Sequence, residues 1–400
     1  MSPSVQQSHF KLLQKFKPDY SPSEFVEYES QRTGMRVVVI DQQGPKVSGY
    51  FVLATEILDD SGAPHTLEHL CFMGSRNYRY KGFLDKLATR VYSNTNAWTA
   101  TDHTAYTLDT AGWEGFARIL PVYLEHVIAP TLTDEGCYTE VHHIDGSGDD
   151  AGVVYSEMQG VQNNSAELMD LAARRSIYPS DVGFRYETGG MMEQLRVLTA
   201  ERIRAFHREM YQPRNLCLII TGEVDHQNML ETLDKFEDTI LDVIPSPNSP
   251  FKRPWVDSKQ TPALETSVTK TVEFPEEDES FGEIEIRFLG PDCSDPVQSK
   301  QYLFSWFSDG DLLLYRWGTQ CCSLVSCWLV RLSFGERPCR KGTSRKCCIL
   351  CYRRSPEHRN PVQLDQRGDR QAGTSRAEVF RSLEGRNGKG NRYEVFERMH

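Results

Sequence analysis

The chain has 400 residues, of which 39% are hydrophobic and 25% are charged, as is typical of a soluble globular protein. No apolar run reaches the roughly 18 residues that a membrane-spanning helix needs, which argues against a membrane partner. The first 25 residues contain no arginine and no continuous apolar core, so they resemble neither a transit peptide nor a signal peptide. These features predict a cytoplasmic protein, with a mitochondrial location as the alternative.

The net charge of −11 is distributed unevenly along the chain. Residues 301–400 contain 18 Lys and Arg against 10 Asp and Glu, and seven of the 11 cysteines lie between Cys321 and Cys351. Because residues 306–400 show no sustained period, we expect a tail that is disordered or aberrant, as a shifted reading frame would produce. A nucleic-acid role for this basic tail is a weaker alternative, since its one C-x-x-C lacks a second pair, and we predict no nucleic-acid partner.

The predicted elements follow one another as short strands and amphipathic helices. Residues 1–25 are interpreted as an N-terminal extension. Strands are predicted at 35–43, 48–55 and 215–224, and a strand pair or one long edge strand at 93–110. A helix is predicted around residues 65–69, where Asp60 or Ser61 could cap the N-terminus and Pro64 suits the first turn. Further helices are predicted at 82–91, 112–130, 153–178, 199–211 and 225–241.

This order predicts an α+β fold, a two-layer sandwich in which helices cover one face of a largely antiparallel sheet. The main domain spans residues 26–243. Residues 244–264 are rich in proline and predict a linker. Strand-like alternation resumes at 265–305, which indicates the start of a second, incomplete domain of the same type before the tail at 306–400.

The segment "HTLEH" places two histidines and a glutamate within five positions of an otherwise apolar run. On a helix, His65 and His69 lie on one face one turn apart, so both imidazoles can bind the same Zn²⁺ ion. Glu68 can reach a water on that ion as a general base, which is the inverted H-x-x-E-H arrangement. The alternative is an ordinary capped helix with histidines that face solvent.

A third zinc ligand should be a carboxylate on another helix. Glu157 is the best candidate, because the apolar neighbours Val153, Val154 and Met158 make an unpaired charge there costly. Asp150 precedes it by two helical turns and could accept a hydrogen bond from a ligand. The alternative is that Glu157 is an acid at a helix start, favoured by the helix dipole.

Four motifs occur in a fixed order between about residues 20 and 300: "HTLEH", "SNTNAWTATDHTAYTL", "GVVYSEMQG" and "YQPRNLCLIITGEVD". Together they resemble the zinc endopeptidases of the pitrilysin and insulin-degrading-enzyme type, peptidase family M16, and in particular the large single-chain branch that includes presequence protease. The resemblance implies an M16/LuxS-like fold, a catalytic domain at 26–243 and one Zn²⁺ per chain.

The resemblance also implies roles for particular residues. His65, His69 and Glu157 match the metal ligands, and Glu68 matches the base. Asp150 takes the place of an acidic residue near the metal, where the family usually has glutamate. The edge strand that pairs with an extended peptide substrate is matched by Asn96 and Ala97.

The function predicted in this way is zinc-dependent hydrolysis of peptide bonds in unfolded peptides by a metal-activated water. Members of this branch have two similar halves that close around the peptide, so a missing C-terminal half or a partner subunit is expected. The alternative is a truncated, catalytically silent fragment that binds metal or peptide without cleaving it.

Overall fold

The computed structural model describes residues 8–259, 261–262, 264–275, 281–292, 325–335 and 345–352. For the last two ranges, and for a few positions in 281–292, it describes the course of the backbone alone. Predictions for most of the segment 306–400 therefore lie outside the described residues.

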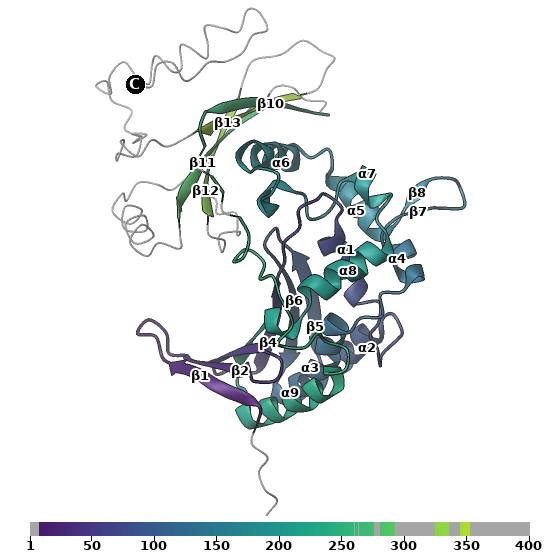
Figure 1. Cartoon of the computed structure of the whole chain (residues 1–400), viewed down its shortest axis with the longest axis vertical. Coiled ribbons are helices and arrows are strands. Elements are labelled where there is room, and N and C mark those ends of the chain that lie inside the picture. The colour runs from purple at the N-terminus through teal and green to yellow at the C-terminus, as the bar shows by residue number, and fades with distance from the viewer. Residues whose placement is uncertain are drawn as a thin grey trace, which may run out of the picture. The chain divides into compact units, whose positions relative to one another are not determined.

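The main sheet has seven strands in the order β1-β2-β3-β9-β4-β6-β5 (Figure 1). Neighbouring strands are antiparallel except for β3 and β9, which are parallel. The sheet is thus largely antiparallel, as predicted. The strands are β1 (Phe10–Phe16), β2 (Glu24–Ser30), β3 (Arg36–Asp41), β4 (Lys46–Ala54), β5 (Ser93–Thr99), β6 (His103–Ala111) and β9 (Leu216–Gly222).

Helices cover one face of this sheet. In β9, Leu216, Leu218 and Ile220 are buried, while the residues between them are partly exposed, as expected for a strand with one covered face. Helix α3 packs against β4 and β6, and α1 and α2 pack against β5. The structure therefore confirms the α+β class. The helices are α1 (Ala63–Cys71), α2 (Phe83–Arg90), α3 (Trp113–Ile128), α4 (Asp134–Glu140), α5 (Val153–Val161), α6 (Ser165–Ile177), α7 (Met192–Leu195), α8 (Ala200–Met210) and α9 (His226–Ile240).

Three local features differ from the sequence prediction. Strands β1 and β2 precede the first predicted strand, and β1 lies within the N-terminal extension. The single helix predicted at 153–178 is two helices, because the Asn164 side chain accepts a hydrogen bond from the Ala166 N–H and so caps α6. Helix α1 is capped by Gly62, at φ 74°, rather than by Asp60 or Ser61.

A second sheet has the order β10-β13-β11-β12, with β10 (Val268–Phe274), β11 (Phe281–Asp292), β12 (Val325–Gly335) and β13 (Arg345–Tyr352). Helix α6 packs on it, and Met169, Ala173 and Ile177 form a small core with Phe274. Strands β12 and β13 fall in the segment 306–400, for which we expected little folded structure. The β12 sequence is rich in branched and aromatic residues, which favour strands.

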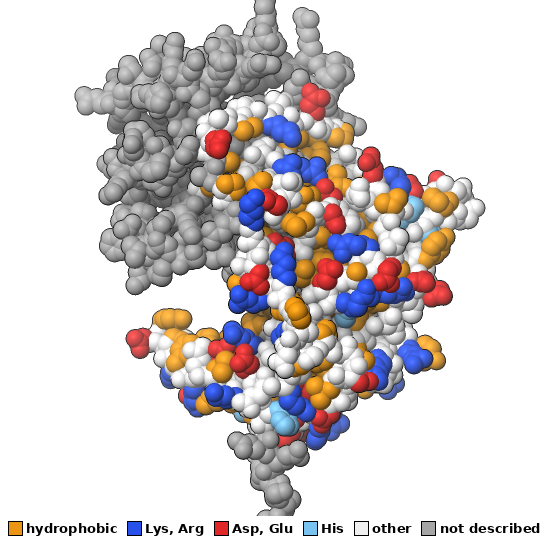
Figure 2. Space-filling view, in the orientation of Figure 1, with side chains coloured by type: hydrophobic (Ala, Val, Ile, Leu, Met, Phe, Trp, Pro, Cys, Tyr) orange, Lys and Arg blue, Asp and Glu red, His pale blue; other side chains and the backbone are white. Residues whose placement is uncertain are grey.

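The proline-rich segment predicted as a linker contains no helix or strand at its described positions, and it lies against the main domain. The Trp255 indole N–H donates to the carbonyls of Thr55, at 2.8 Å, and Asp102, at 3.0 Å. Across the described ranges, no helix has both the length and the apolar character required to cross a bilayer. On the face shown in Figure 2, Lys and Arg side chains are interspersed with Asp and Glu.

Candidate metal centre

Helix α1 directs both motif histidines to one face. Leu67 and Leu70, on the opposite face, are almost completely buried in the main core. The rings of His65 and His69 lie 4.9 Å apart between centroids and are nearly perpendicular. The apolar side of the helix therefore fixes where the two imidazoles point.

Glu157, on α5, completes a group of three possible ligands. Its Oε1 lies 3.7 Å from His65 Nε2, and its Oε2 lies 3.6 Å from His69 Nε2. One ligand atom from each residue can be chosen so that all lie within 4.8 Å of one another. Helix α1 packs against α4 and α5, and α5 also packs against α4 and α7 (Figure 1). The structure thus brings together the three residues that the sequence predicted as metal ligands.

The donor set fits Zn²⁺. Two imidazoles and one carboxylate, with a fourth position left open, are a common ligand set of catalytic zinc. Tetrahedral zinc with bonds of about 2.0 Å separates its ligand atoms by roughly 3.3 Å, close to the nitrogen–oxygen distances found here. The Glu157 side chain is 53% exposed, so the site is open to solvent on that side.

Glu68 lies on the same helix but is buried. Its Oε2 accepts a hydrogen bond of 2.5 Å from the Thr99 hydroxyl, at the end of β5. Burial raises the pKa of the Glu68 carboxyl, and Glu157 adds to this, while Thr99 and the His69 imidazole lower it. A carboxylate placed beside the reacting groups can accept a proton and release it again, as general acid–base catalysis requires.

Glu140 is a site residue that the sequence analysis missed. This buried carboxylate lies at the end of α4. Its Oε2 is 3.7 Å from His69 Nδ1, and its Oε1 accepts a hydrogen bond of 2.8 Å from Lys81. The interaction with His69 is the main cause of a lowered Glu140 pKa. Glu140 therefore faces the ring atom of His69 that points away from Glu157.

The structure gives Asp150 different partners from those expected. Its carboxylate is bound by His142 Nε2 at 2.6 Å, by the Tyr155 hydroxyl at 3.0 Å and by the Arg196 guanidinium at 2.8 Å. Asp150 thus stabilises the two-stranded β7–β8 hairpin (His143–Ile144 and Asp150–Ala151), and Glu140, not Asp150, is the carboxylate beside a ligand histidine.

Asn96 and Ala97 lie in the middle of β5, the edge strand of the main sheet. Within the described residues β5 pairs with β6 alone, so one row of its backbone groups is free. Because Thr99 of this strand contacts Glu68, the free edge ends beside the candidate base.

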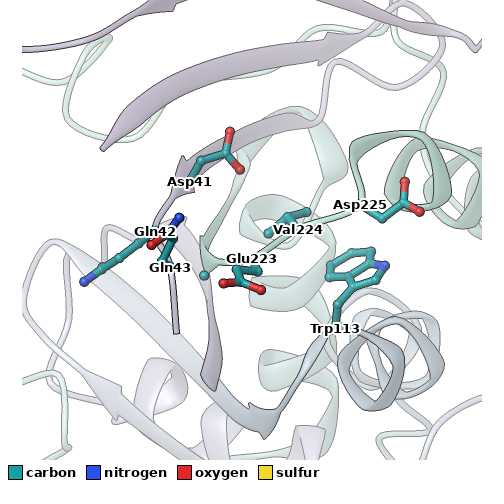
Figure 3. A pocket seen from close by; sticks show the side chains of 8 residues that line it. Asp41, Gln42, Gln43, Trp113, Glu223, Val224 and Asp225 are labelled. Atoms are coloured by element: carbon teal, nitrogen blue, oxygen red, sulfur yellow. The ribbon is translucent and has the colours of Figure 1, made fainter. Parts of the chain in front are cut away.

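A separate hollow of about 520 Å³ lies away from these residues, near the ends of β3 and β9 (Figure 3). Trp113 and three carboxylates line it, but each carboxylate has a protein partner: Asp41 binds His226, Glu223 accepts from the Gly44 N–H, and Asp225 caps α9. The hollow includes none of the predicted site residues.

Comparison with known proteins finds two family models that match segments of this chain. Residues 55–159 match the family described as insulinase, peptidase family M16, and residues 198–307 match the peptidase M16 inactive domain. An uncharacterized protein of Saccharomyces cerevisiae is 46% identical over 314 residues, covering 76% of this chain and 30% of the relative. Presequence protease 1 of Arabidopsis thaliana, a chloroplastic/mitochondrial protein by name, is 28% identical and covers 57% of this chain and 22% of the relative.

The solved structure of pitrilysin is similar in fold, with a TM-score of 0.52 and 17% identity, covering 75% of this chain and 31% of pitrilysin. A protease from Helicobacter pylori also gives a TM-score of 0.52, at 16% identity, covering 68% of this chain and 62% of the protease. The chain spans about 30% of the length of the yeast relative. The two segments that match domains of this family together cover more than half of the chain, which shows that it belongs to the M16 peptidase family.

Proposed function

We propose that the chain is a zinc-dependent metalloendopeptidase that hydrolyses peptide bonds of unfolded peptides. The observation that carries this proposal is the convergence of His65, His69 and Glu157 beside the buried Glu68. The same residues and spacing suit the metal-assisted hydrolysis expected of an M16 peptidase.

In the proposed mechanism, the two Nε2 atoms and the Glu157 carboxylate hold the metal. Zn²⁺ bound there would polarise the scissile carbonyl and lower the pKa of the attacking water. Glu68 takes the proton from that water and later delivers it to the leaving amine. Thr99 holds the Glu68 carboxylate in place through its hydroxyl.

The substrate is proposed to bind as an added strand on β5, through Asn96 and Ala97. An extended peptide can use the free backbone groups of this edge, which ends beside Glu68. The matched part is only 30% of the yeast relative, so the substrates of the whole protein are proposals too. The need for a second half or a partner subunit is likewise a proposal.

The decisive test is cleavage of a quenched fluorescent peptide. We expect activity that a chelator abolishes and that added Zn²⁺ restores. Glu68→Gln should keep bound metal, because its ligands are intact, but lose turnover by at least about 100-fold, as expected for loss of a general base. Normal turnover of the Glu68→Gln variant would discard the role of Glu68, and metal binding without any cleavage by the unsubstituted chain would favour a silent fragment.

We propose a cytoplasmic location for this chain. The alternative is the mitochondrion, which the names of the presequence protease relatives give as the location of those proteins. Fractionation of cells that express the tagged chain distinguishes the two.

A further inference from the structure

Helix α1 begins in direct backbone contact with a short loop, residues 187–190, which we call the support loop. A Cβ on Gly62 would lie 2.7 Å from the Gly189 carbonyl oxygen and 2.8 Å from Gly190 Cα. Gly62 and Gly190 have φ values of +74° and +91°, which favour glycine. The first residue of the metal-binding helix and this loop therefore leave no space for a side chain between them.

Asp60 ties the support loop to the segment that enters α1. Its Oδ1 accepts from the Glu187 N–H at 2.8 Å, and its carbonyl accepts from the Met191 N–H at 2.9 Å. Its Oδ2 pairs with Arg175 at 2.8 Å. The loop is thus fixed at both ends by one residue.

The Glu187 side chain binds both α6 and the backbone of the support loop. It pairs with Arg174 at 2.8 Å and accepts from the Gly189 N–H at 3.1 Å. Arg174 is 11% exposed, so this ion pair is shielded from water. Two arginines of α6 therefore hold the support loop against α1.

His65 lies in the first turn of α1, three residues after Gly62. Its Nδ1 is buried and has no hydrogen-bond partner in the part of the chain that the structure describes. A histidine that binds metal through Nε2 carries its proton on Nδ1, and a neighbouring acceptor selects that tautomer.

We propose that the support loop and Asp60 are positioning elements for His65, because they fix the start of the helix whose first turn carries it. This inference rests on the proposed zinc site. Without the loop, the first turn of α1 could shift, and the Nδ1 side of His65 would lose its fixed surroundings, so metal affinity should fall even though no ligand is changed.

The test is Gly190→Ala, with Gly148→Ala as the matched control. Both glycines have φ near +90°, but a Cβ at Gly190 would lie 2.8 Å from Gly62 Cα, whereas one at Gly148 meets nothing within 4 Å. Zn²⁺ affinity is measured on the full chain by competition with a chromogenic chelator, and ligand geometry by the visible spectrum of bound Co²⁺. We expect about tenfold weaker Zn²⁺ binding and an altered Co²⁺ spectrum for Gly190→Ala, and no change for Gly148→Ala.

A second pair keeps the test decisive if Gly190→Ala does not fold. Asp60→Ala removes the side-chain contacts to the Glu187 N–H and to Arg175. Asp59→Ala removes a neighbouring carboxylate whose partners are Arg202 and the Ser61 N–H. We expect weaker Zn²⁺ binding for Asp60→Ala alone. Unchanged affinity and spectrum in both test variants, or equal losses in both controls, would overturn this inference and leave the zinc site standing. Failure of the unsubstituted chain to bind Zn²⁺ would overturn the proposed function and this inference with it.

Discussion

Glu140 ends α4 and Asp150 lies in β8, and these two acidic residues have different partners. Glu140 faces His69 Nδ1, while Asp150 is bound by His142, Tyr155 and Arg196. Acceptors behind a ligand histidine typically contribute 10–100-fold to metal affinity. We therefore expect Glu140→Gln to weaken Zn²⁺ binding at least about tenfold, measured by chelator competition.

Asp150→Asn is the matched control for that substitution. It also replaces a carboxylate by an amide, but on a residue that does not face the ligand histidines, so we expect Zn²⁺ affinity within about twofold of the unsubstituted chain. The opposite ranking of the two variants would return Asp150 to the role that the sequence predicted for it.

The sequence could predict the three residues that the structure brings together as candidate ligands, but not Glu140. His65 and His69 follow from helical spacing alone, and Glu157 stands among apolar residues of a helix. The prediction for Asp150 also relied on helical spacing, yet α5 begins at Val153, so Asp150 lies in a strand outside that periodicity. Glu140 depends on α4 packing against α1, a tertiary contact that no local pattern reveals.

His207 gives the stability of the fold a pH dependence. Burial lowers the pKa of its imidazole to about 4, and Nε2 lies 3.1 Å from the Val127 carbonyl. Below pH about 6.5 the unfolded chain binds a proton that the folded chain does not bind until pH about 4, so stability falls over this window. The free energy of unfolding of the unsubstituted chain should therefore fall between pH 7 and pH 5. In His207→Gln this fall should be smaller, by at most about 2 kcal/mol, as measured by urea unfolding at the two pH values.

At the scale of single elements, the two edge strands of the main sheet provide an internal comparison. Strand β5 ends beside Glu68, whereas β1, at the opposite edge, does not approach the candidate metal ligands. If an extended peptide adds to β5, its backbone amides become hydrogen-bonded. We expect a saturating peptide to slow hydrogen exchange of residues 93–99 in Glu68→Gln at least about threefold and to leave residues 10–16 unchanged. Equal slowing in β1, or none in β5, would contradict binding at this edge.

Element boundaries were less predictable than element types. The "QNN" stretch between α5 and α6 has helical neighbours on both sides, and the break becomes visible only when Asn164 is recognised as a cap. Strand β1 was missed because its pattern does not alternate: Leu12, Leu13 and Phe16 are all exposed.

At the scale of the whole molecule, the described residues form two separate cores. The larger lies between the main sheet and its helices, and includes Leu218 of β9. The smaller lies between α6 and the second sheet, and includes Met169 and Phe274. Helix α6 belongs to the predicted main domain by sequence but buries its apolar side in the smaller core, so the two predicted domains share this helix.

This arrangement predicts that the two cores can be weakened separately. Phe274 is 3% exposed and Leu218 is fully buried, so truncating either to alanine should cost about 3–5 kcal/mol of local stability. Because proteins open in local cooperative units, Phe274→Ala should accelerate hydrogen exchange in α6 and β10 and spare β9, while Leu218→Ala should do the reverse. If Phe274→Ala instead accelerates exchange in β9 as much as in β10, the two cores unfold as one unit, and the second sheet is an integral part of the catalytic fold.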